Sequence, residues 1–181
     1  MGKAKYLVFL GSLFLMAFGL PEKLDKKVRK EITSHFGMGQ FQLQDIAIPH
    51  AVSDQLPMAI SESNFFGIYN GDDNSLTGYA FVDRAPSKTA QFDYLVLFCP
   101  DLKVVHSKVL IYREEYGGEI GSKRWLRQFL GMSGKDRVAV GENVDGISGA
   151  TISVRSMTRS MDNLLQSIGI LREKGILDHG S

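Results

Sequence analysis

The sequence is short of the residues from which metal and thiol redox centres are built. It contains one cysteine, Cys99, among 181 residues. One cysteine excludes an intramolecular disulfide and a CxxC pair, and zinc or iron–sulfur sites need partners that the chain lacks. Four histidines lie far apart without ligand spacing: His35, His50, His106 and His179. We interpret them as solvated or hydrogen-bonded side chains.

Neither sign of charge dominates. The chain has 21 basic and 20 acidic residues, a net charge of +1, and the basic residues are spread along it. There is therefore no electrostatic case for nucleic-acid binding. No internal repeat or low-complexity tract is present. Because 44% of the residues are hydrophobic, we expect one globular domain with a core.

The N-terminal apolar run is too short for a typical membrane span, which needs roughly 20 residues. Residues 1–23 read MGKAKYLVFLGSLFLMAFGLPEK. Two lysines precede an apolar stretch from Tyr6 to Phe18, and small residues lead up to Gly19. We expect residues 1–19 to be a signal peptide cleaved after Gly19, with an uncleaved membrane anchor as the alternative. In either case we expect a bacterial protein that is exported to the cell envelope, either to the periplasm or to the outer face of the cytoplasmic membrane.

Residues 20–63 are expected to hold an amphipathic helix followed by a linker and strand region. Leu24, Val28 and Ile32 recur every four residues with charges between them, which predicts a helix. Two roles remain open for it: a linker between the membrane and the main domain, or packing on that domain. The alternation over 41–48 predicts a half-buried strand, and a loop follows to residue 63.

Residues 64–181 are expected to form the main domain. Four segments have strand patterns separated by turn signals: 64–70, 76–85, 92–99 and 103–114. A short helix over 121–131 and a long C-terminal helix, with an apolar stripe from Val154 to Ile168, follow them. Strands followed by helices predict an α+β fold, in which one antiparallel sheet carries a few packed helices.

A glycine turn precedes the last helix, in the stretch DGISGATISVRSM from Asp145 to Met157. Gly146 and Gly149 permit unusual backbone conformations, and Ser148 or Thr151 suits a helix N-cap. Helix N-termini attract phosphate, so the Thr151 hydroxyl could bind a phosphate or be esterified by it. A capped helix start with no ligand is the alternative interpretation.

The same stretch resembles the flavinylation motif Asp-x-x-(Ser/Thr)-Gly-Ala-(Ser/Thr) of FMN-binding domain proteins. These are similar to the flavinylated subunits of the Rnf complex and of the sodium-pumping NADH:quinone oxidoreductase. Asp145, Ser148, Gly149, Ala150 and Thr151 match its fixed positions. The resemblance implies that a flavin transferase, using FAD and magnesium, joins FMN to Thr151 through a phosphoester. It also implies membrane or envelope redox proteins as electron donor and acceptor.

A second block, residues 109–131, is similar to a family segment in which a strand leads into a glycine turn and a short helix. The family often has (Thr/Ser)-Pro-Gly-Leu-Gly at this turn, where the chain has YGGEIG. The resemblance implies that Tyr116 and Gly118 lie near the cofactor, together with Ser153, which retains a hydroxyl after the attachment site. Asp145 either helps the transferase recognise the turn or bonds turn amides. Tyr116 either flanks the flavin ring or is an ordinary turn aromatic.

Three functions follow from these observations. The first is an exported flavoprotein that relays electrons through FMN on Thr151, an electron-transfer protein more than an independent enzyme. The second is a flavin-dependent reductase of a small molecule, which turnover with soluble donor and acceptor alone would favour. The third is a non-redox envelope binding module, which colourless protein after co-expression with a flavin transferase would favour.

Overall fold

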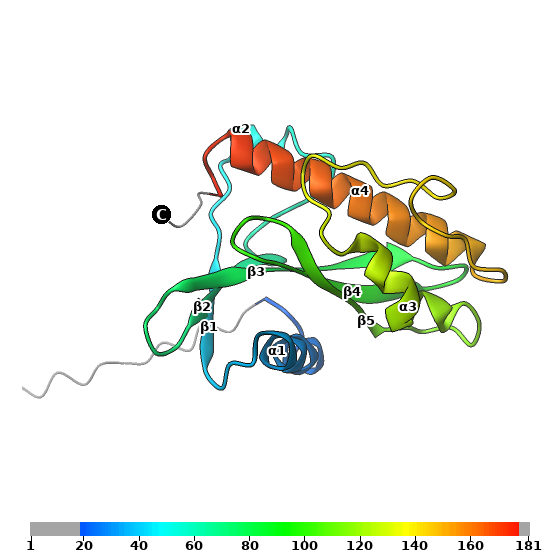
Figure 1. Cartoon of the computed structure of the whole chain (residues 1–181), viewed down its shortest axis with the longest axis horizontal. Coiled ribbons are helices and arrows are strands. Elements are labelled where there is room, and N and C mark those ends of the chain that lie inside the picture. Colours follow the sequence, from blue (N-terminus) through cyan, green and yellow to red (C-terminus); the bar gives the residue numbers. More distant parts are fainter. Residues whose placement is uncertain (1–18, 178–181) are drawn as a thin grey trace, which may run out of the picture.

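The computed structural model describes residues 19–177. Predictions about the apolar N-terminal stretch fall on residues 1–18, outside the described range. The described chain has the predicted α+β architecture, in which one antiparallel sheet lies between helices on its two faces (Figure 1). No helix within residues 19–177 is long and apolar enough to cross a membrane.

The sheet is a meander in which every strand pairs with its neighbours in sequence. Its order is β1 (Phe41–Asp45), β2 (Phe65–Asn70), β3 (Leu76–Pro86), β4 (Gln91–Phe98) and β5 (Val104–Ile111). The four predicted strands from β2 to β5 are confirmed. β1, which ends three residues earlier than predicted, pairs with β2 from Phe41↔Asn70 to Asp45↔Phe66. The predicted domain boundary at residue 64 thus falls between two paired strands.

Both faces of the sheet are covered, which explains the nearly continuous apolar sequence of β4. Because side chains alternate along a strand, Tyr94 and Val96 join the core under the C-terminal helix, whereas Leu95 and Leu97 join the core under the N-terminal helix. All four are fully buried. The sheet is therefore a rigid layer between two apolar cores.

The helices occupy opposite sides of this sheet (Figure 1). Helix α1 (Glu22–Phe36) packs on one face through the predicted residues Leu24, Val28 and Ile32. Helix α4 (Thr151–Glu173) packs on the other. Of the two roles left open for α1, the structure thus shows packing on the domain.

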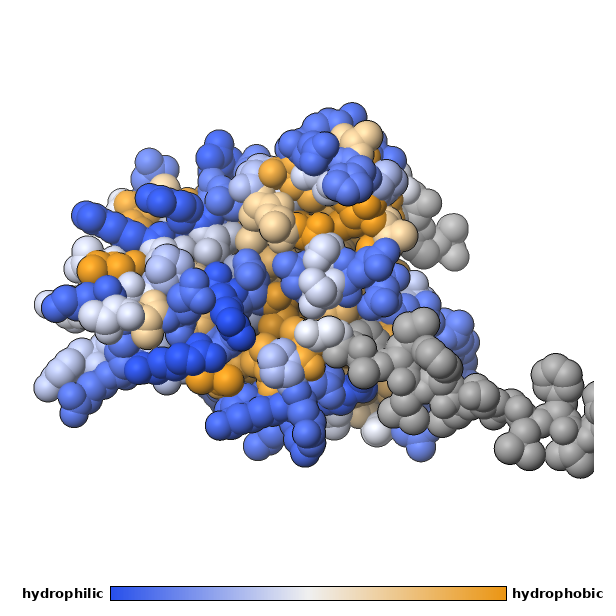
Figure 2. Space-filling model, turned by 180° about the vertical axis from the view of Figure 1, so that it is seen from behind, coloured by the Kyte–Doolittle hydropathy of each residue, from blue (hydrophilic) through white to orange (hydrophobic). Residues whose placement is uncertain are grey.

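Short helices interrupt the connecting segments. Helix α2 (His50–Ser53) lies in the segment predicted to be a loop. The helix predicted over 121–131 is instead α3 (Lys123–Leu126) continued by a 3₁₀ turn, η2 (Arg127–Phe129), after an earlier 3₁₀ turn, η1 (Gly118–Gly121). Trp125 and Phe129 are buried in the α4-side core. From the side opposite to Figure 1, apolar surface is visible among the charged side chains (Figure 2).

Candidate functional site

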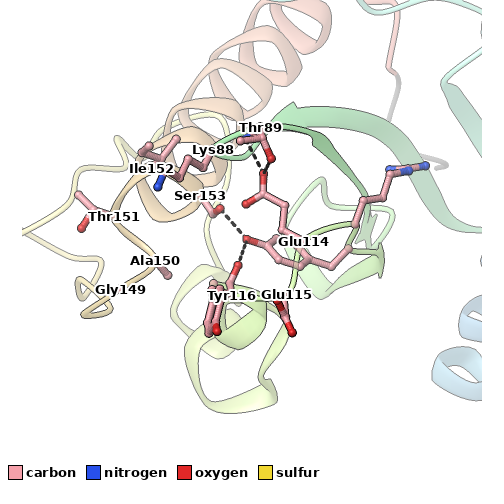
Figure 3. A pocket seen from close by; sticks show the side chains of 13 residues that line it. Lys88, Thr89, Glu114, Glu115, Tyr116, Gly149, Ala150, Thr151, Ile152 and Ser153 are labelled. Carbon is pink, nitrogen blue, oxygen red and sulfur yellow. Dashed lines mark hydrogen bonds between the residues drawn. The ribbon is translucent and has the colours of Figure 1, made fainter.

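A pocket of about 630 Å³ opens where three segments meet: the β3–β4 turn, the loop after β5 and the start of α4 (Figure 3). Its volume lies within the range of small-molecule sites, roughly 300–1,000 Å³. The residues that line it are Lys88, Thr89, Tyr112, Arg113, Glu114, Glu115, Tyr116, Gly117, Gly149, Ala150, Thr151, Ile152 and Ser153. Residues more than 60 positions apart in sequence, such as Lys88 and Thr151, therefore line the same cavity.

The pocket gathers most of the residues singled out in the sequence. Five of them line it: Tyr116, Gly149, Ala150, Thr151 and Ser153. Asp145 lines a separate, smaller cavity beside α3. Gly118 and Ser148 line neither of these cavities, and Gly117 takes the place expected for Gly118.

Helix α4 starts without a side-chain cap. Its N-cap residue is Ala150, and no side chain within the described residues accepts a hydrogen bond at this cap. The expected cap by Ser148 or Thr151 is therefore wrong: Thr151 is already the first helical residue, and the buried methyl of Ala150 occupies the cap position. Uncapped N–H groups at a helix start carry partial positive charge, which favours an anion.

Two glycines shape the pocket for different reasons. Gly149 has a φ of +83°, and a Cβ added to it would meet no atom within 4 Å, so open space lies above this turn. Gly117 has a φ of +87°, and its added Cβ would lie 2.6 Å from the Tyr112 hydroxyl. Gly149 leaves room for a ligand, whereas Gly117 lets the loop after β5 approach its neighbours closely.

A chain of hydroxyls ties the loop after β5 to α4. The Tyr112 hydroxyl donates to the Tyr116 carbonyl at 3.0 Å and lies 3.0 Å from Ser153 Oγ (dashed in Figure 3). Since its one proton goes to Tyr116, Ser153 must donate to Tyr112. Ser153 is buried, so its hydroxyl ties α4 to the loop after β5 and is less accessible than that of Thr151, which is exposed.

Sequence reasoning missed Tyr112. It stands directly after β5 in a run of strand-like residues, where nothing in the sequence separates it from a core aromatic. Its ring packs against Phe92, with centroids 5.9 Å apart. Only the fold shows that its hydroxyl reaches the pocket.

Asp145 is fixed through its backbone. Trp125 Nε1 donates to the Asp145 carbonyl at 2.8 Å, and the Asp145 N–H donates to Gln128 Oε1 at 2.7 Å. The side chain is exposed and, within residues 19–177, accepts no hydrogen bond from the turn amides. The interpretation in which Asp145 bonds turn amides is therefore not what the structure shows.

Residues 89–166 match the family model of the FMN-binding domain. This part of the chain is similar to the FMN-binding domain family. The matched range runs from the β3–β4 turn through the loop after β5 into α4, so the similarity includes parts of all three segments that form the pocket.

The fold has a relative among solved structures. The chain is similar to NqrC of Shewanella oneidensis, with 15% sequence identity and a TM-score of 0.52 over 85% of this chain and 98% of that chain. At this identity the likeness shows a shared fold. No curated protein matches the sequence.

The residues of the pocket fit FMN. A phosphate requires hydrogen-bond donors and positive charge, and the uncapped start of α4 and Lys88 provide both. A flavin ring requires flat apolar surface, and the side chains of Tyr116 and Ile152, which are 78% and 51% exposed, line the same cavity. The pocket therefore offers hydrogen-bond donors and positive charge at Lys88 and the start of α4, and apolar surface at Tyr116 and Ile152.

Proposed function

We propose that the protein is an exported flavoprotein that relays electrons through FMN joined by a phosphoester to Thr151. One observation carries the proposal: the Thr151 hydroxyl is exposed on the uncapped first turn of α4, beside the pocket of an FMN-binding domain. An exposed hydroxyl can enter the active site of a second enzyme, which a buried one such as that of Ser153 cannot.

The attachment is a phosphoryl transfer without change of oxidation state. Thr151 Oγ forms a bond to the phosphorus of the FMN half of FAD, and the pyrophosphate bond to the AMP half breaks. AMP leaves with the bridging oxygen, and the threonine proton passes to a base of the flavin transferase. Magnesium in that enzyme balances the phosphate charge.

The chain's own residues then hold the cofactor. The N–H groups at the start of α4 face the phosphate, and Gly149 leaves space for it. Tyr116 and Ile152 flank the ring. The exposed Asp145, held by Trp125 and Gln128, marks the turn for the transferase.

Bound FMN supplies one- and two-electron chemistry, while the protein fixes its position. The proposed partners are membrane or envelope redox proteins that deliver and accept electrons, as the NqrC-like fold and FMN-binding domain support. Residues 1–19 direct export, and the ester keeps FMN on the protein outside the cytoplasm.

Intact mass spectrometry tests the attachment. After co-expression with a flavin transferase, we expect the full chain to gain one FMN less one water and to fluoresce in a denaturing gel. The same spectrum reports whether residues 1–19 have been removed. Thr151→Ser should retain the flavin because it keeps the hydroxyl, and Thr33→Ala, at an exposed threonine of α1, is the control that should not lose it.

Thr151→Ala should abolish covalent flavin with an unfolding free energy within about 0.5 kcal/mol of the parent, since the site is exposed. Flavin that survives denaturation in this variant would refute the assignment. Turnover of a soluble donor and acceptor by the loaded protein alone would instead favour the small-molecule reductase. Unmodified mass in the parent would favour the non-redox binding module.

A further inference from the structure

The pocket contains a cation, Lys88, to which residues 19–177 assign no structural contact. Arg113 is already bound, because its guanidinium pairs with the buried Asp93 at 2.5 Å and donates to the Gln91 carbonyl at 2.7 Å. Lys88 is exposed and, among the described residues, forms no hydrogen bond or ion pair. Its side chain extends from the β3–β4 turn toward the first turn of α4 (Figure 3).

The turn that carries Lys88 is fixed by one carboxylate oxygen. Glu114 Oε1 accepts from Ser87 Oγ at 2.7 Å, from the Ala90 N–H at 2.9 Å, and from both the N–H and the hydroxyl of Thr89. These donors lie on both sides of Lys88 in sequence. These bonds fix the backbone on both sides of Lys88, and with it the point from which the lysine side chain extends.

The chemistry of the facing segment matches this charge. The Thr151 hydroxyl and the uncapped start of α4 lie across the same cavity. A phosphoester of FMN carries a negative charge at neutral pH, and an ammonium group close to it forms a charge-assisted hydrogen bond. Glu115, which also lines the cavity, has the wrong sign for this role.

We propose that Lys88, positioned by Glu114, is the cation that contacts the FMN phosphate on Thr151. This inference rests on the proposed function and adds a residue from outside the flavinylation motif. Lys88 acts as a positioning residue during attachment, because it holds the phosphate next to the Thr151 hydroxyl.

Two readouts test the role of Lys88 in the full chain. The first is the initial rate of flavin incorporation from FAD with purified flavin transferase and magnesium. We expect Lys88→Met to be about three- to ten-fold slower than the parent, the range of one partly exposed charge contact, and Lys88→Arg to retain most of the rate. Lys123→Met, which removes an exposed lysine of another cavity, should match the parent.

The second readout is the ³¹P resonance of the loaded protein, which reports the phosphate surroundings directly. Lys88→Met should move this resonance and Lys123→Met should not. Glu114→Ala, which removes the acceptor oxygen, should move it in the same direction as Lys88→Met, because the turn is released while Lys88 remains. Melting temperatures show that each variant is folded.

The outcomes separate this inference from the proposed function. If the parent takes up no flavin, the proposed function fails. If the parent is loaded and Lys88→Met leaves the ³¹P resonance unchanged, the inference is overturned, whatever its rate, because a slower rate alone would place Lys88 at the transferase contact. A moved resonance with a slower rate supports it.

Discussion

The two ends of helix α4 use glycine in opposite ways. Near the first residue, Gly149 has open space where a Cβ would point. Near the last turn, an added Cβ at Gly169 would lie 2.9 Å from the Gly134 carbonyl oxygen, and one at Gly134 would lie 2.5 Å from Gly169 Cα. One end of the helix is left accessible and the other is closed by backbone packed against backbone.

The free energies involved explain why α4 can begin without a side-chain cap. A missing N-cap costs about 0.5–2 kcal/mol, whereas each buried aliphatic side chain contributes roughly 1.5–3 kcal/mol. The stripe of α4 buries several completely: Met157, Met161, Leu164, Leu165 and Leu171. The closed part therefore fixes the helix, and its first turn can remain uncovered without loss of position.

The largest effect is expected at the closed end. Gly134→Ala should lower the free energy of unfolding by about 1–3 kcal/mol, because the new methyl meets helix backbone that cannot move aside cheaply. Urea denaturation measures the loss. Gly146→Ala is the matched control, since nothing lies within 4 Å of its added Cβ, and it should change stability by less than about 0.5 kcal/mol. Equal losses in both variants would disprove the closed contact.

A smaller loss of stability is expected at the open end, with a larger loss of function. Gly149→Val places a β-branched residue at a φ of +83°, which costs about 1–2 kcal/mol. The isopropyl group also fills the space proposed for the phosphate. The folded Gly149→Val variant should therefore take up no covalent flavin. Gly149→Ala carries similar backbone strain with a smaller side chain, and it should retain part of the covalent flavin. Full labelling of Gly149→Val, measured by intact mass, would show that the phosphate lies elsewhere.

Repeating patterns of apolar residues in the sequence predicted the two long helices and the sheet. The four-residue period of Leu24, Val28 and Ile32 and the stripe of α4 reflect burial on one helix face, so both helices were predicted correctly. The alternation and turn signals likewise predicted the meander. The helix predicted over 121–131 was too long. The same apolar spacing fits an α-helical turn and a 3₁₀ turn, so the sequence did not separate α3 from η2.

The site was predictable only where its residues are contiguous. The stretch from Gly149 to Ser153 enters the pocket as one segment, so its motif named most of one wall. Lys88 and Tyr112 enter through tertiary packing, and their neighbours in sequence carry no sign of it. Between Gly117 and Gly118, the backbone conformation of the turn decided which one faces the pocket.

A moderate effect is expected from the hydroxyl chain that connects α4 to the opposite wall. Tyr112→Phe removes the donor to the Tyr116 carbonyl and the acceptor of Ser153. We expect a loss of about 1 kcal/mol in unfolding free energy, the net value of such a bond plus partial exposure of its partners. Ser153→Ala should cost less, because the Tyr112–Tyr116 bond survives. It should also reduce flavin attachment less than Thr151→Ala. Equal loss of flavin attachment in Ser153→Ala and Thr151→Ala would identify Ser153 as part of the attachment chemistry.

The smallest effect concerns pH, at the turn that faces the open end. Hydrogen bonds, first that from the Thr89 N–H, hold the pKa of the Glu114 carboxyl below its ordinary value of 4.5. The stabilisation is therefore complete above pH 4.5 and is lost as the pH falls through the lower folded-state pKa. The Arg137 side chain likewise lowers the pKa of Asp162, so a stability curve alone does not separate these carboxyls.

Amide proton shifts do separate them, because the Thr89 and Ala90 N–H groups bond Glu114 and the Val138 N–H bonds Asp162. The Thr89 and Ala90 shifts should titrate together with a midpoint below 4.5, and Glu114→Gln should abolish that transition while leaving the one at Val138. A Thr89 midpoint at or above the ordinary value would mean that Glu114 does not anchor the turn. Lys88 would then be mobile, and the open end of α4 would face a cation that the fold does not position.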